Sequence, residues 1–232
     1  MTHGQGAADV RTDADANADN ETADGTNQEF WHSRYGESER IWSGDPNTVL
    51  VAEVTGLKPG RALDLGCGEG ADSIWLAGQG WRVTAVDISG VALARAERHA
   101  ATADLGVAER IDWQRHDLAV SFPAGAFDLV SAQFLHSPGD MPRERILRKA
   151  AAAVAPGGVL LIVGHAGLPS WESNPHPEVH LPTPAEVLES LELPDGEWEV
   201  LLSAEHERIQ TRPDGQPGTR TDNALKLRRR PV

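Results

Sequence analysis

The chain has 232 residues, 40% of them hydrophobic, and a formal net charge of −14 at pH 7. Its apolar runs fall short of the roughly 18 residues that span a bilayer, which argues against a membrane-spanning role. An acidic chain is also a poor match for a long polyanion, because nucleic acids are bound through clustered lysines and arginines. We therefore expect no membrane and no nucleic-acid partner.

The cysteine content and the N-terminus indicate the compartment. Cys67 is the only cysteine, so an internal disulfide is excluded. The first residues lack the basic and apolar regions of a signal peptide. Together these features favour the reducing cytoplasm. The one basic cluster, Lys226 to Arg230, is interpreted as a strand end with solvated arginines rather than as a nucleic-acid patch.

Residues 1–28 contain almost no large apolar side chain. Such a segment cannot offset the entropy that it would lose on ordering, so we predict a disordered acidic tail. One domain is expected over residues 29–232. Early in this domain, Asp45 is placed to cap a helix that has Pro46 in its first turn and ends at Gly56.

Beyond this point, apolar strand-like runs alternate with helical patterns. The predicted strands are 61–66, 82–87, 110–117, 127–133 and 158–165, and the predicted helices are 71–79, 89–103, 142–155 and 184–192. Ser89 and Thr183 are expected to be N-caps, the latter in a capping box with Glu186. The alternation predicts an α/β fold, a Rossmann-like doubly wound sheet with right-handed crossovers. Two final strands, 197–205 and 218–229, predict a C-terminal antiparallel hairpin that completes a seven-stranded, mostly parallel sheet.

The stretch "ALDLGCGEGADSIWLA" places Gly66, Gly68 and Gly70 directly after the first predicted strand and before a helix. A bare backbone at that point lets a ligand approach closely, and the helix N-terminus offers unpaired N–H groups. Asp87 ends the next strand, 17 residues beyond Gly70. A carboxylate at this position can accept hydrogen bonds from both hydroxyls of a ribose.

Two details distinguish this loop from the loops of nicotinamide enzymes. Its glycine spacing is GxGxG rather than GxGxxG. Asp64 also puts a negative charge beside the loop, which is unfavourable for a pyrophosphate and favourable for an ammonium group. S-adenosylmethionine, part nucleoside and part zwitterionic amino acid, satisfies both conditions. A nicotinamide oxidoreductase is the poorer interpretation.

The motif "LDLGCGEG" followed by "VTAVDIS", with "HDL", "FDLVSAQFLH" and "PGGVLLIVGH" further on, resembles the motifs of class I S-adenosylmethionine-dependent methyltransferases. With the aromatic head "FW…RY…W", the chain is similar to the bacterial branch near the tellurite-resistance and thiopurine S-methyltransferase families, which methylate small, soft nucleophiles. The resemblance implies a small-molecule methyltransferase, acting first of all at sulfur or another chalcogen. O- or N-methylation of a small metabolite is the alternative, as is a non-catalytic S-adenosylmethionine-binding protein.

The resemblance also implies a set of cofactor contacts. It places Asp64, Gly66, Gly68 and Gly70 around the methionine moiety with Cys67 as a small filler, Asp87 at the ribose, Ile88 against the adenine, Asp117 and Leu118 at the adenine amino group and its neighbourhood, and Gln133 near the sulfonium. Trp31, Arg34, Tyr35, Trp42 and Asn47 would fold over the cofactor mouth, where aromatic faces attract a cation. The alternative for the acidic residues is a capping or solvent-facing role.

His136 and His165 follow or end the fourth and fifth predicted strands, so they are candidate general bases for a hydroxyl or amine acceptor, or else structural histidines. A thiol or chalcogenide needs little help from a base. His176 and His180 are separated by Pro177, which spoils a helical metal pair, so no metal is expected. The Asn/Asp-Pro-Pro-aromatic motif of nucleic-acid amino methyltransferases is replaced by "QFLH". The expected partner is a small-molecule acceptor, bound by a monomer or homodimer.

Overall fold

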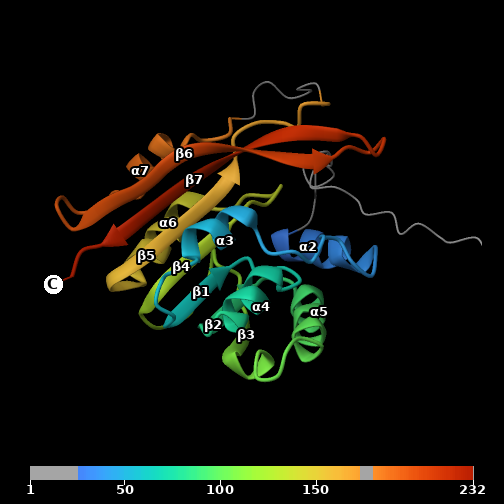
Figure 1. The fold of residues 1–232 in the computed structure, drawn as a ribbon, viewed down its shortest axis with the longest axis horizontal. Helices are drawn as coiled ribbons and strands as arrows, with labels where there is room; N and C mark the ends of the chain where they lie inside the picture. Colours follow the sequence, from blue (N-terminus) through green and yellow to red (C-terminus); the bar gives the residue numbers. More distant parts are fainter. Residues whose placement is uncertain (1–25, 173–179, 232) are drawn as a thin grey trace, which may run out of the picture.

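The computed structural model describes residues 26–172 and 180–231. At its centre lies a seven-stranded sheet with the order β3-β2-β1-β4-β5-β7-β6 (Figure 1). Its strands are β1 (Arg61–Leu65), β2 (Arg82–Asp87), β3 (Ile111–Arg115), β4 (Phe127–Gln133), β5 (Val154–His165), β6 (Trp198–Thr211) and β7 (Pro217–Arg229). The first five strands run parallel, and β7 runs antiparallel between β5 and β6. The predicted fold class is confirmed.

The helices connect these strands much as the sequence predicts. They are α2 (Asn27–Gly36), α3 (Thr48–Val54), α4 (Ala71–Gly78), α5 (Gly90–Ala101), the short 3-10 helix η1 (Ala108–Arg110), α6 (Arg143–Ala152) and α7 (Pro184–Ser190). The N-caps at Ser89 and Thr183 are confirmed, and Glu186 completes the predicted capping box. No helix among the described residues is both long and apolar enough to cross a bilayer.

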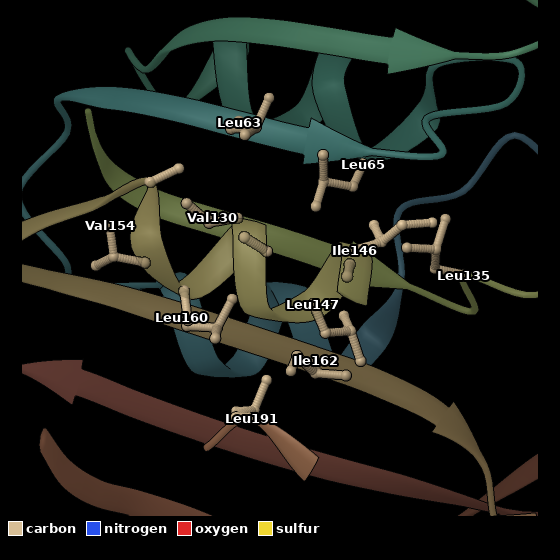
Figure 2. Packing of buried hydrophobic residues seen from close by; sticks show 14 of the residues in the cluster. Leu63, Leu65, Val130, Leu135, Ile146, Leu147, Val154, Leu160, Ile162 and Leu191 are labelled. Carbon is tan, nitrogen blue, oxygen red and sulfur yellow. The ribbon is translucent and has the colours of Figure 1, made fainter. Parts of the chain in front are cut away.

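Both faces of the sheet are covered, because successive residues of each central strand point to opposite sides. On one face, Leu63 and Leu160 belong to the same buried cluster as Ile146 of α6 (Figure 2). On the other face, Ala62 clusters with Leu76 of α4. Each fully buried leucine contributes about 1.5–3 kcal/mol to stability. With both faces occupied by helices, the carboxyl ends of the parallel strands are the place left for a ligand.

Helix α2 and its cap begin slightly before the predicted start of the domain. Thr26 caps α2 by accepting a hydrogen bond from the N–H of Glu29, and the Glu29 carboxylate accepts from the N–H of Thr26 at 2.8 Å. Residues 26–28 therefore belong to the domain, which corrects their assignment to the tail. Residues 1–25 lie outside the described residues. A threonine followed three residues later by a glutamate is the capping-box signature that marks this start in the sequence.

The N-cap of α3 is Asn47 rather than the predicted Asp45. The Asn47 side-chain oxygen accepts hydrogen bonds from the N–H groups of Val49 at 2.8 Å and Leu50 at 3.3 Å. Pro46 accordingly precedes the cap instead of standing in the first turn. The N–H of Asn47 also donates to Asp72 of α4 at 2.6 Å, which ties the start of α3 to the next helix.

The C-terminal hairpin is longer than predicted, because β6 continues to Thr211 instead of ending at residue 205. β7 pairs with β5 only from Asp222 onward, whereas β6 and β7 pair with each other as far as Thr211 and Pro217. Residues 206–221 therefore form a two-stranded extension past the end of β5, visible at the right of Figure 1 and called the hairpin arm below.

The basic cluster lies at the end of β7, as predicted. Lys226 Nζ contacts the carboxylate of Glu53 at 3.0 Å, and Arg228 contacts that of Glu199 at 3.6 Å. These positive charges are balanced within the fold, which favours the interpretation as a strand end over a binding patch.

Candidate functional site

A cavity of about 1370 Å³ lies beyond the carboxyl ends of the parallel strands. One part of its wall, called the loop half below, is built from the glycine loop, the end of β2 and the segment after β3. The other part, the arm half, is built from the segment after β4, the end of β5 and the hairpin arm. Small-molecule pockets usually measure about 300–1,000 Å³. This cavity is therefore large enough for two molecules side by side.

The glycines shape the loop half. Gly66, Gly68 and Gly70 have φ angles of +73°, +52° and +88°, in a region that residues with a Cβ rarely adopt. A Cβ on Gly68 would lie 2.9 Å from the hydroxyl oxygen of Tyr35, and a Cβ on Gly70 would lie 2.7 Å from the ring of Trp113. The absence of a Cβ on Gly68 therefore lets Tyr35 of the head approach the loop. The absence of a Cβ on Gly70 lets the start of α4 pack closely against Trp113 of β3. All three glycines and Cys67 line the cavity.

Asp87 lies on the cavity wall at the end of β2, where the sequence places it. One carboxylate oxygen accepts a hydrogen bond from the N–H of Gly68 at 2.9 Å, and the other accepts from the N–H of Ser89 at 2.8 Å. Burial raises the pKa of Asp87, and these N–H groups act in the opposite direction. Each oxygen retains a second lone pair for a ligand hydroxyl. The same contacts fix the loop and orient the carboxylate.

The predicted role of Asp64 fits the structure less well than a role for its neighbour Asp72. Asp64 is buried behind the loop, where Ser73 donates a hydrogen bond to it at 2.6 Å, and it is not part of the described cavity wall. Asp72, in the first turn of α4, does line the cavity. Burial is the main reason that the pKa of Asp64 rises to about 7 and that of Asp72 to about 6.

The sequence prediction missed Asp72, although an acidic residue in the first turn of a helix that follows a glycine loop is a readable signal. A ligand ammonium group at this end of the cavity would meet the carboxylate of Asp72 directly. Asp64 would act on the same group only through the electrostatic field, from behind the loop.

Three further residues named in the sequence analysis belong to the loop half. Ile88, Asp117 and Leu118 all line the cavity. One oxygen of the exposed Asp117 accepts a hydrogen bond from the N–H of Ala119 at 2.9 Å, so the side chain partly serves a local turn. The second oxygen, together with the apolar surfaces of Ile88 and Leu118, forms a slot between β2 and the segment after β3.

The head of the domain covers part of the cavity. Trp31, Tyr35, Trp42 and Asn47 line it. The indole N–H of Trp42 donates to the hydroxyl of Tyr35 at 3.1 Å. Arg34 does not contribute to the described wall: it is buried beside the head and pairs with a glutamate three residues later in the chain, at 3.3 Å. Arg34 lies about 100° around the helix from its neighbour Tyr35, which lines the cavity.

Glu69, which sequence reasoning overlooked, joins this head to the loop. Its carboxylate accepts hydrogen bonds from the N–H groups of Ile41 at 3.1 Å and Trp42 at 3.2 Å. Arg95 of α5 donates to the same carboxylate at 2.8 Å and also donates to the backbone carbonyl of Tyr35. A charged residue between two loop glycines is the only sequence signal of this role, and it does not name the partner.

The arm half contains both candidate histidines and the predicted Gln133. All three residues line the cavity. Gln133 donates to Ser131 at 2.9 Å, while its buried Oε1 has no hydrogen-bond partner among the described residues. The same holds for the buried Nε2 of His136. Burial and the nearby His165 lower the pKa of His136 to about 3, so its ring is neutral at pH 7. These polar atoms without partners are suited to a bound molecule.

His165 is held by a residue that the sequence prediction did not single out. Its Nδ1 lies 3.0 Å from Oδ1 of Asp222 on β7, and Oδ2 of Asp222 accepts a hydrogen bond from Arg208 Nε at 2.5 Å. His165 also stacks on Phe134, with ring centroids 4.5 Å apart, and on His136 at 5.2 Å. Asp222 lies in the predicted final strand, but the sequence does not show that it stands opposite His165. Arg208 lies in the part of β6 beyond the predicted end at residue 205.

The described residues include no group of three or more His, Cys, Asp or Glu side chains that could hold a metal ion. His180 instead lies 3.1 Å from the carboxylate of Glu186, at the start of α7. His176 lies outside the described residues.

Comparison with known proteins agrees with this geometry. Residues 62–158 match the family model described as a methyltransferase domain. The chain is 33% identical over 156 residues to glycine N-methyltransferase of Oryctolagus cuniculus, a match that covers 62% of this chain and 52% of that protein. The chain thus spans about half the length of the curated relatives that it matches, or less.

Two solved structures share the fold at lower identity. One is a structure described by the conversion of a disulfide bond into a thioacetal group during echinomycin biosynthesis. It aligns with a TM-score of 0.65 and 23% sequence identity, and the alignment covers 88% of this chain and 92% of that one. The other is TehB from Haemophilus influenzae, with a TM-score of 0.58 and 19% identity, covering 88% of this chain and 67% of that one. Residues 62–158 therefore match a methyltransferase domain, and the chain shares its fold with solved structures that include S-adenosylmethionine-dependent methyltransferases.

Proposed function

We propose that the protein binds S-adenosylmethionine in the loop half of the cavity and methylates a small molecule held in the arm half. The observation that carries this proposal is the contact between the glycine loop and Asp87, which joins a bare backbone to a carboxylate at the end of the next strand. In nucleotide-binding folds, a carboxylate at this strand end hydrogen-bonds to a ribose, while the bare glycine backbone lets the ligand approach the loop. The match of residues 62–158 to a methyltransferase domain supports it.

The residues present fit the proposed cofactor. Asp87 is placed to accept from the ribose hydroxyls and Asp72 to pair with the ammonium group, while Ile88 and Leu118 offer an apolar slot for the adenine. The buried Oε1 of Gln133, which has no hydrogen-bond partner within residues 26–172 and 180–231, offers a polar position in the arm half. When bound, S-adenosylmethionine supplies a methyl group already activated by a sulfonium.

The chain's own contribution is alignment and exclusion of water, since an activated donor needs little further chemistry. The head provides the cover: Tyr35 is buried against Gly68 and is hydrogen-bonded to Trp42. Glu69 anchors the backbone of the same segment. Aromatic faces in this cover also favour a cation beneath them.

The geometry of the arm half favours an acceptor that must lose a proton, namely a hydroxyl or an amine. His165 is held by Asp222 at 3.0 Å beside the cavity, which is the arrangement of a general base with its orienting carboxylate. A relative that matches about half its length to this chain is named for N-methylation of glycine. Oxygen or nitrogen is accordingly our first candidate for the acceptor atom.

The second candidate is sulfur or another chalcogen, which the sequence resemblance favours. The arm half supports it through an apolar wall that includes Phe134, Leu135, Met141 and Ile146. Aromatic rings and a methionine suit a soft, polarisable atom. A thiolate would need His165 only to orient or shield it.

The function is tested by incubating the full chain with S-adenosylmethionine and separate sets of acceptors, and measuring S-adenosylhomocysteine by mass spectrometry. The sets are thiols, selenite and tellurite on one side, and phenols, amines and amino acids on the other. We expect product with at least one small acceptor and loss of product in Asp87→Ala. Binding of the cofactor without turnover in any set would favour the non-catalytic alternative, and failure to bind it would overturn the proposal.

A further inference from the structure

The hairpin places a carboxylate directly beside the histidine at the end of β5. His165 and Asp222 are cross-strand partners in the antiparallel pair of β5 and β7. The Nδ1–Oδ1 distance is 3.0 Å, and the exposed fractions of the two side chains are 8% and 2%. Arg208 of β6 approaches from the other side, with its Nε 2.5 Å from Oδ2. Three neighbouring strands thus contribute one residue each to a single chain of hydrogen bonds.

The hydrogen bonds among Arg208, Asp222 and His165 determine which nitrogen of His165 carries the proton. A carboxylate held by a guanidinium is ionised and can only accept hydrogen bonds. The 3.0 Å contact therefore requires Nδ1 of His165 to be the donor. In the neutral ring the remaining nitrogen, Nε2, then has the basic lone pair.

The ring is also fixed in orientation. His165 stacks on Phe134 with an interplanar angle of 29° and on His136 with 26°. Phe134 has φ +50°, a strained conformation for a residue with a side chain, and the guanidinium of Arg208 lies over its ring at 5.7 Å. A strained backbone conformation of this kind persists where the surrounding structure holds it in place. Here it places the ring of Phe134 against the ring of His165.

The charges around the two histidines divide their roles. Burial lowers the pKa of His136 most, and His165, Arg143 and Arg220 lower it further, so its ring is neutral at pH 7. The carboxylate of Asp222 contacts His165 directly, and Arg208 contacts the second oxygen of that carboxylate. A proton arriving on His165 would therefore meet a negative neighbour, whereas one arriving on His136 would meet the positive charges of Arg143 and Arg220 in a buried setting.

We infer that Asp222, held by Arg208, is a positioning residue that keeps His165 in the Nδ1–H form, with Nε2 as the acceptor of the proton from a hydroxyl or amine substrate. The O–H or N–H bond of the substrate breaks and an N–H bond forms at Nε2. The electron pair left on the substrate forms the bond to the methyl carbon, whose former bonding pair stays on the cofactor sulfur. The proton passes later to water. The substrate class in this inference rests on the proposed function, but the protonation state of His165 does not.

The first test is therefore made without substrate, by ¹⁵N nuclear magnetic resonance of the histidine rings in the full chain. We expect Nδ1 of His165 to be protonated and Nε2 to be unprotonated near neutral pH, and Asp222→Asn to abolish this preference. Glu199→Gln, which removes a carboxylate from an arginine pair elsewhere on the same hairpin, should leave the His165 signals unchanged. A proton on Nε2 in the native chain would overturn the inference, whatever the fate of the proposed function.

The second test uses an acceptor identified by the product assay. Asp222→Asn and His165→Asn should each lower kcat by about 10²–10⁴-fold, with KM changed by less than about threefold, and Asp222→Glu should restore part of the loss. Folding is checked by the melting temperature; if Asp222→Asn does not fold, Arg208→Gln replaces it and should give a smaller loss of kcat. A loss below tenfold that shrinks as pH rises would contradict a proton-accepting role and favour sulfur. Failure to bind the cofactor would instead sink only the proposed function.

Discussion

Glu69 of the glycine loop and Arg95 of α5 form a buried ion pair, with their nearest nitrogen and oxygen atoms 2.8 Å apart. The pair does more than balance two charges. Glu69 accepts from the backbone N–H groups of Ile41 and Trp42, and Arg95 donates to the carbonyls of Tyr35 and Ser38. Arg95 of α5 thus holds one end of the segment that covers the cavity, and Glu69 of the loop holds the other.

Removing either charge of this pair should loosen the cover and destabilise the fold. Breaking a buried pair by removing one partner typically costs about 3–5 kcal/mol, because the other charge is left without compensation. We expect Arg95→Met to lower stability by such an amount and to weaken S-adenosylhomocysteine binding by at least about tenfold. Chemical denaturation and calorimetry would measure the two effects.

Arg148→Met is the matched control, since Arg148 pairs with Glu192 at 2.9 Å in a more exposed position. Removal of that pair should cost below about 1 kcal/mol and leave binding unchanged. Equal effects of the two substitutions would show that the buried pair does not hold the cover.

Gly68 should tolerate a methyl group far less well than a glycine in a helix. Its φ of +52° and the 2.9 Å approach to Tyr35 predict that Gly68→Ala lowers stability by about 1–3 kcal/mol and weakens ligand binding. A Cβ on Gly78, near the end of α4, would have nothing within 4 Å of it, so Gly78→Ala should be neutral or slightly stabilising. Thermal melting of both variants tests this; similar melting temperatures would contradict the strained-loop account.

Two truncations test where the domain begins. Removal of residues 1–25 retains Thr26 and its capping box and should leave the melting temperature within about 1 °C, since that segment has almost no apolar surface to contribute. Removal of residues 1–28 also deletes Asn27, whose side chain donates to the carbonyl of Asp140 at 2.8 Å and accepts from Ser137 at 2.6 Å. Loss of a cap alone costs about 1 kcal/mol, so the melting temperature should fall by several degrees. Identical melting of the two truncations would place the boundary later in the chain.

Asp64 predicts a specific pH dependence of stability. Its pKa in the fold rises from 3.8 to about 7, so the folded state favours the neutral carboxyl. The stability that the fold gains from the neutral Asp64 carboxyl is fully present below the unfolded pKa of 3.8, and it is lost as pH rises through about 7. Asp64→Asn keeps an acceptor for Ser73 without a charge, so its melting temperature relative to the native chain should increase from about pH 5 to about pH 8.5. A difference that stays constant over this range would show that Asp64 is already ionised at low pH.

The central sheet was predictable because its strands are short apolar runs separated by clear helical patterns. The hairpin arm was not, since residues such as Glu207, Arg208 and Gln210 are polar and carry no apolar alternation. They form a strand because β7 pairs with them residue by residue, from His206 opposite Asp222 to Thr211 opposite Pro217. In the hairpin arm, the hydrogen-bonded pairing of β6 with β7 determines the strand, and no local alternation of apolar and polar residues indicates it.

The glycine loop and Asp87 in the loop half of the cavity could be found from the sequence, but the contacts that position them could not. The loop glycines and Asp87 lie in one motif and at one strand end, so their spacing alone brings them together. Glu69 and Asp222 take their roles from partners on other elements, Arg95 and His165, at sequence separations of 26 and 57 residues. A single sequence does not show which distant charge a given side chain will meet.

The central claim, that the loop half of this cavity binds S-adenosylmethionine and its product, is tested most directly by calorimetric titration of the full chain with S-adenosylhomocysteine, with NAD as the comparison ligand. The account predicts one site for S-adenosylhomocysteine, at least tenfold tighter binding than NAD, and at least tenfold weaker binding in Asp87→Ala. This loss corresponds to one charge-assisted hydrogen bond of about 1.5–3 kcal/mol. Asp104→Ala, which removes an exposed carboxylate away from the cavity, should bind as the native chain does. Tighter binding of NAD, or an unchanged affinity in Asp87→Ala, would contradict the account.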